Sequence, residues 1–64
     1  MGYEEARDIL LEDIDERGYT EALIKPNGIL DTYLKRMVDE GLVVSVRVEE
    51  LDERGLHYSK IFRK

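Results

Sequence analysis

Cysteine is absent from this 64-residue chain, as are tryptophan and glutamine, while proline, asparagine and histidine each occur once. Without cysteine the chain has no disulfide, no thiolate nucleophile and none of the usual cysteine-based zinc sites. A lone histidine, His57, makes a histidine-based metal site or catalytic constellation within one chain unexpected. The sequence therefore predicts a protein that is not an enzyme and needs no metal or cofactor, with His57 on the surface.

Long hydrophobic runs are also absent. No stretch approaches the roughly 20 apolar residues of a membrane span, and the first residues are acidic where a signal peptide is basic. We expect no membrane contact, a cytoplasmic location and a single domain over 1–64, close to the lower size limit for a self-sufficient core. Charged residues make up 39% of the chain, a composition typical of thermophile proteins.

The net charge of −5 is unevenly distributed along the chain. Residues 1–24 hold eight acidic and two basic residues, whereas residues 25–64 hold seven acidic and eight basic residues. A charge of this sign opposes binding to nucleic acid, which depends on neutralising phosphates with lysine and arginine. Any such binding must therefore involve the C-terminal part of the chain.

One segment joins a helix signal to a strand signal across a glycine. Residues 28–40 place an apolar stripe at helical spacing, made of Leu30, Tyr33, Leu34, Met37 and Val38. Gly41 suits the left-handed conformation that ends a helix, and the β-branched residues after it favour a strand. The segment predicts a helix over 28–40 that turns directly into a strand.

A second helix is predicted over 3–17, with acidic residues in its first turn and Gly18 after its end. Its inward stripe is expected to be Ala6, Ile9, Leu10 and Ile14. Pro26-Asn27-Gly28 is a turn signal before the next helix. The span within 19–25 is expected to hold either a short helix or a strand.

A C-terminal antiparallel hairpin is predicted over 42–51 and 56–63, with a turn at 52–55. Its alternating valines indicate a strand with one buried face, expected to carry Val44, Val46, Val48, Tyr58 and Phe62. The expected register pairs Val48 with Lys60 and Val46 with Phe62. The opposite face is expected to expose Arg47, Glu49, His57, Ser59, Ile61 and Arg63. There Ile61 is expected either to be covered by the helix over 3–17 or to form, with Tyr19 and Tyr3, an apolar surface for a partner.

The residues Leu34-Lys35-Arg36-Met37 and Gly41-Leu42-Val43, within the segment Ile29 to Val44, give the chain a likeness to a known family. The segment resembles the recognition helix and wing of winged helix-turn-helix domains. The resemblance implies a small winged-helix-like α+β fold and a DNA-binding transcriptional regulator. The helix 28–40 would then enter a major groove, and the 52–55 turn would lie along the backbone as a wing. The family's second helix is shortened or replaced in this chain.

Under this reading double-stranded DNA is the partner, and a homodimer matches a palindromic site. The expected contact residues are Asn27, Gly28, Thr32, Lys35, Arg36, Arg47, Arg54, Lys60 and Arg63. The alternative for Lys35 and Arg36 is pairing with Asp31, Asp39 or Glu40 at helical spacing. The alternative function is a winged-helix protein-interaction module, or a dimeric adaptor without direct DNA binding.

Overall fold

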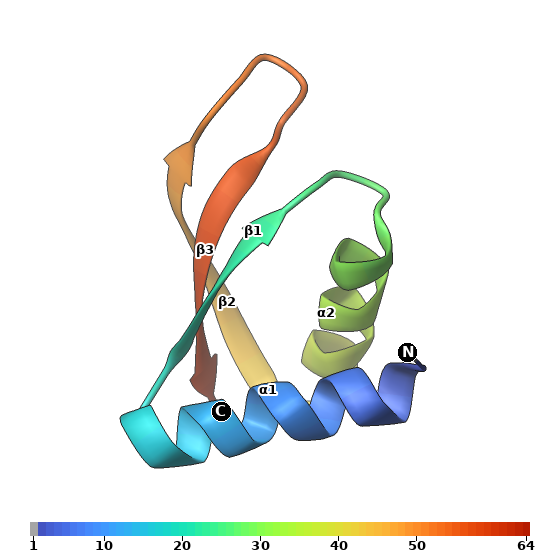
Figure 1. Cartoon of the computed structure of the whole chain (residues 1–64), viewed down its shortest axis with the longest axis vertical. Coiled ribbons are helices and arrows are strands. Elements are labelled where there is room, and N and C mark those ends of the chain that lie inside the picture. Colours follow the sequence, from blue (N-terminus) through green and yellow to red (C-terminus); the bar gives the residue numbers. More distant parts are fainter. Residues whose placement is uncertain (1) are drawn as a thin grey trace.

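The computed structural model describes residues 2–64 as a helix, a strand, a second helix and a hairpin. The elements are α1 (Tyr3–Arg17), β1 (Thr20–Ile24), α2 (Ile29–Asp39), β2 (Val43–Glu50) and β3 (His57–Arg63). The strands form one antiparallel sheet in the order β1-β3-β2. Helix α1 lies across one end of the sheet, and α2 lies beside the sheet (Figure 1). The expected α+β class is confirmed, and the span within 19–25 holds a strand.

Helix α1 packs through a stripe that differs from the expected one. Ala6 and Ile14 are buried and Leu10 is half-buried, but Ile9 is 51% exposed and its predicted burial is wrong. The ring of Tyr3 packs edge-on against Tyr33 of α2, with 5.6 Å between their centroids. Because Tyr3, Ala6, Leu10 and Ile14 recur at nearly whole helical turns, burying this row directs Ile9 away from the core.

Helix α2 ends as its sequence predicts. Gly41 has φ +77°, the left-handed conformation that glycine adopts without strain, and its N–H donates to the carbonyl of Val38 at 3.0 Å. The N–H of Leu42 donates to the carbonyl of Met37 at 3.0 Å, so the chain leaves the helix straight into β2. Of the predicted apolar stripe, Leu34 and Met37 are buried, whereas Val38 is 40% exposed.

The core lies on one face of the sheet, which we call the inner face, and Ile61 of the central strand is at its middle. Ile61 is fully buried with Val43, Ile24 and Ile14. Pairing of Ile61 with Thr20 and Ser45 places all three side chains on this face. His57 and Ser59 lie on the inner face too and are buried. The expectation that His57 and Ser59 are exposed is therefore wrong, whereas Ile61 is covered, which is one of the two alternatives expected for it.

The predicted hairpin exists, but its faces are reversed relative to the core. Val44, Val46, Tyr58 and Phe62 do share one face, and it is the face that points away from the helices. Val44 is 45% exposed, Val46 50% and Val48 55%. The predicted buried face of the hairpin is therefore the outer face of the sheet.

The strand register also differs from the expected one, although a shift of two residues does not change which side chains share a face. Val46 pairs with Lys60 and Val44 with Phe62, two residues from the expected register, and an irregularity follows between Arg47 and Glu49. The turn itself is where the sequence predicts it: Gly55 has φ +88°, and the Asp52 carboxylate accepts hydrogen bonds from the N–H groups of Arg54 and Leu56. The bulge adds one residue to β2, which a prediction from regular alternation omits.

Replacing Ile61 by alanine tests which face is the core. We expect Ile61→Ala to lower the free energy of unfolding by about 3 kcal/mol, because a fully buried isoleucine leaves a cavity. The matched change Ile9→Ala, at an exposed site, should alter it by less than about 0.5 kcal/mol. Urea unfolding measures both. Equal losses for the two variants would contradict the placement of the core.

Candidate functional site

The two cations in the middle of α2 are engaged by carboxylates of the same helix. Lys35 Nζ lies 3.1 Å from Asp31 Oδ2, and Arg36 Nε lies 2.9 Å from Glu40 Oε1. The Arg36 guanidinium also lies 4.0 Å from the centre of the Tyr3 ring, which connects α2 to α1. The pairing alternative for Lys35 and Arg36 is therefore present in the structure. Arg36 in addition has a structural role in helix packing.

The N-terminal end of α2 already holds an anion, the Asp31 carboxylate. Its Oδ2 accepts the N–H of Asn27 at 3.0 Å, and the Thr32 hydroxyl donates to the carbonyl of Gly28 at 3.1 Å. Asn27 adopts φ +62°, which this residue tolerates in turns. The amide at Asn27 that was expected near a phosphate is thus satisfied within the chain.

The pKa of Asp31 reflects these contacts. Partial burial raises the pKa of this carboxyl, but the hydrogen bond from Asn27 and the nearby Lys35 ammonium outweigh burial and hold it below its ordinary value. Asp31 is thus ionised in the folded chain at neutral pH. Its negative charge occupies the place that a bound phosphate requires.

The remaining expected contact residues lie on different surfaces. Arg47 is on the inner-face side of β2, Arg54 is in the hairpin loop, and Lys60 is on the outer face with its Nζ 5.1 Å from the Tyr19 ring. Arg63 Nε lies 3.8 Å from Asp15 Oδ1 of α1. The structure does not bring these four cations together.

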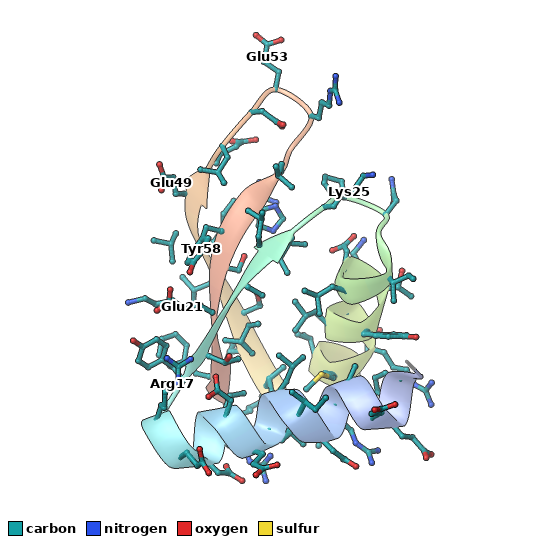
Figure 2. The ribbon with its side chains drawn as sticks, viewed as in Figure 1. Arg17, Glu21, Lys25, Glu49, Glu53 and Tyr58 are labelled. Atoms are coloured by element: carbon teal, nitrogen blue, oxygen red, sulfur yellow. The ribbon has the colours of Figure 1, made fainter. Side chains whose placement is uncertain are left out.

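Two cations do line one hollow, between the β1–α2 turn and the hairpin loop. It measures about 310 Å³ and is lined by Lys25, Pro26, Asn27, Asp52, Arg54 and Leu56. Lys25 was not among the expected contact residues, and its place next to the turn in the sequence was the signal for it. Figure 2 shows Lys25 at this turn, with Glu53 at the tip of the hairpin. Residues 25–56, which include α2, β2 and the hairpin loop, carry seven carboxylates and five cations.

A second hollow, the cleft between α2 and the inner face, measures about 320 Å³. Its lining includes Asp31, Lys35, Asp39, Ser45 and His57. The His57 Nδ1 lies 2.7 Å from the carbonyl oxygen of Gly55 and donates to it. A backbone carbonyl, and not a carboxylate, therefore orients the imidazole, unlike the arrangement that activates a serine nucleophile.

The outer face of the sheet divides into a polar half and an apolar half. On the β1 side the Tyr58 hydroxyl donates to Glu21 Oε2 at 2.6 Å, and Figure 2 shows both residues on the side away from α2. The phenol lowers the pKa of Glu21, and the Glu21 carboxylate raises the pKa of Tyr58. The polar groups on this half are thus paired within the chain.

On the β2 side the outer face is apolar. Val44 and Val46 lie on it next to Phe62, which is 37% exposed, and Val48 and Leu51 continue along the exposed hairpin. Every residue of β2 after Val43 is exposed, because no helix covers this strand beyond its start. The uncovered side chains on the outer face and hairpin, Leu23, Val44, Val46, Val48, Leu51 and Phe62, are almost as numerous as the seven apolar residues of the core. Sequence reasoning missed this surface because alternating valines are typical of a buried face.

No protein-family model, curated protein or solved structure matches this chain. Among residues 2–64 no cluster of three or more histidine or acidic side chains is arranged to hold a metal ion. None of the described helices is long and apolar enough to cross a membrane. The expected partner patch is also revised, since Ile61 is buried and Tyr3 packs between the two helices.

Acid unfolding tests the role of Asp31. Because its folded pKa lies below the unfolded value, its stabilising contribution is complete above the unfolded pKa and is lost as the pH falls through the folded pKa. We expect Asp31→Asn to be less stable than the wild type at neutral pH and to lose less stability on acidification. Urea unfolding from about pH 7 to about pH 2.5 measures this. Asp39→Asn, an exposed change on the same helix, is the control; an identical profile for both variants would contradict the assignment.

Proposed function

We propose that this domain functions as a protein-interaction module that associates with a second copy of itself through the apolar half of its outer sheet face. The observation that carries this proposal is the exposure of Val44, Val46 and Phe62 on one surface. Contiguous apolar surfaces of this kind mark association sites in soluble proteins, whereas isolated exposed apolar residues are ordinary. The polar groups on the β1 half are already paired and leave the β2 half for a partner.

A second copy is the partner we favour because the apolar half lies at an open edge of the sheet. Strand β2 is the last strand in the order β1-β3-β2. An edge that carries valines and is not covered by a helix is a template for pairing with another strand. A second copy supplies the same row of valines, so that each chain covers the other's exposed side chains.

Sedimentation equilibrium tests this function. Because this interface would rest on a small number of exposed side chains, we expect a reversible dimer over about 10 µM to about 1 mM. We expect Val46→Lys to weaken self-association about tenfold or more, because it places a charge among apolar side chains. Ile9→Lys, the same kind of change at an exposed site on α1, should leave it unaltered. A monomer at every concentration would contradict the proposed function.

DNA binding is the second candidate. What favours it is the order of elements, in which an exposed helix leads directly into a hairpin, together with the closeness of Lys25 and Arg54 at one end of α2. Against it stand the excess of carboxylates over cations in residues 25–56 and the Asp31 carboxylate at the helix start. Because phosphate neutralisation supplies most non-specific affinity, this charge balance favours the interaction module.

Fluorescence anisotropy with a labelled mixed-sequence duplex separates the two candidates. At about 50 mM salt we expect no binding up to about 100 µM protein, because the helix and hairpin carry net negative charge. The double variant Lys25→Glu with Arg54→Glu should give the same flat titration. Binding by the wild type that weakens with salt and disappears in the double variant would instead establish DNA binding.

A further inference from the structure

The backbone of β2 has a free edge with a defined polarity. The N–H of Lys64 donates to the carbonyl of Leu42 at 3.2 Å, so Leu42 directs its backbone groups toward β3. Hydrogen-bonded pairs alternate along an antiparallel ladder, so Val44 and Val46 also direct theirs toward β3. Ser45, which lies between these two valines, and Arg47, which follows Val46, direct their N–H and C=O groups outward, away from the sheet.

This polarity, together with the proposed self-association, requires that outward-directed residues of one β2 pair with outward-directed residues of the other. We propose that β2 pairs antiparallel with β2 of a second copy about a two-fold axis at Val46, giving one continuous six-stranded sheet. Ser45 of each chain then lies opposite Arg47 of the other, and the outward backbone groups of both residues form four hydrogen bonds across the seam. A pairing centred on Arg47 would set the two Arg47 side chains directly opposite each other, and a pairing centred on Ser45 would place Val48 opposite Leu42 instead of Val44.

Side chains on the outer face agree with this register. Val46 of one chain lies directly opposite Val46 of the other, as a pair without backbone hydrogen bonds, in which side chains approach most closely. Val44 lies level with Val48 of the second copy, so the exposed valines of both chains form one apolar stripe. Val46 is 50% exposed in the single chain and becomes covered from its open side.

The charges near the seam also permit this pairing of the two β2 strands. Arg47 is opposite the neutral Ser45, and no like charges stand directly opposite in the regular part of the strand. The Lys60 side chains are three strand spacings apart, about 14 Å, which exceeds the screening length of about 8 Å at physiological salt. The bulge begins only after Arg47, so the segment Val43–Arg47 is a regular, unprotected edge.

The helices leave room for the seam. Helix α2 packs against β2, but every residue of β2 after Val43 is exposed, so this contact is confined to the start of the strand. The edge of β2 around Val46 is therefore not covered by a helix of its own chain. An axis at Val46 normal to the sheet keeps both pairs of helices on the same face of the joined sheet.

Engineered disulfides test this register, since the natural chain has no cysteine. In oxidised glutathione buffer we expect Val46→Cys to form a disulfide-linked dimer, because directly opposite Cα atoms lie about 4.5 Å apart. Val44→Cys is the matched control on the same face. Its two Cα atoms lie about 13 Å apart in this register, so cross-linking should be at least about tenfold slower.

A second pair of variants keeps the test independent of Val46. Ser45→Cys and Arg47→Cys should cross-link when mixed and should not do so alone, because each lies about 8 Å from its own copy. If the chain self-associates but Val46→Cys is no faster than Val44→Cys, and the mixed pair does not cross-link, this register is wrong and the proposed function stands. A chain that stays monomeric overturns both.

Discussion

Burial of Ile61 at the middle of the central strand is the constraint on which the rest of this structure depends. Successive side chains of a strand point to opposite faces, so the burial of Ile61 also assigns Ser59 and His57 to the core side. Both helices lie on this side, α1 through Ile14 and α2 through Leu34 and Met37. The same constraint directs Lys60, Phe62 and their neighbours on β2 to the surface.

A three-stranded sheet with helices on one face leaves its other face to solvent or to a partner. In this chain the β1 half of that face, apart from the exposed Leu23, is polar and internally paired, through Tyr58 with Glu21 and through cations over the Tyr19 ring. The β2 half is apolar and unprotected. The surface chemistry therefore changes across the sheet, and the apolar part coincides with the edge strand.

The sequence is informative about elements and less so about their assembly. The limits of α1, the turn at Pro26 to Gly28 and the helix end at Gly41 were predicted correctly because capping residues and turn glycines act locally. The buried face of the hairpin was predicted wrongly, because both alternating sets of side chains contain apolar residues. Val44, Val46 and Phe62 lie on one side of the sheet, and Val43 and Ile61 lie on the other. Pattern alone cannot decide between them when one set is covered by helices and the other is exposed.

In the candidate site, too, local pairing could be predicted from the sequence, whereas the arrangement of residues from different elements could not. Lys35 and Arg36 were identified as exposed cations of α2, and their pairing with Asp31 and Glu40 follows from helical spacing. That Lys60 and Arg63 lie far from this helix depends on the sheet order and register, which the sequence does not encode locally. The exposed valines were recognised as a set but placed in the core, because a surface that binds a partner has the composition of an interior.

Amide hydrogen exchange measured at increasing protein concentration tests directly whether β2 is the edge through which two chains pair. The N–H groups of Ser45 and Arg47 should become more protected as the concentration rises from about 20 µM to about 1 mM, while those of β1 stay unchanged. Fast exchange of both amides at every concentration, as for an open sheet edge, would contradict this pairing.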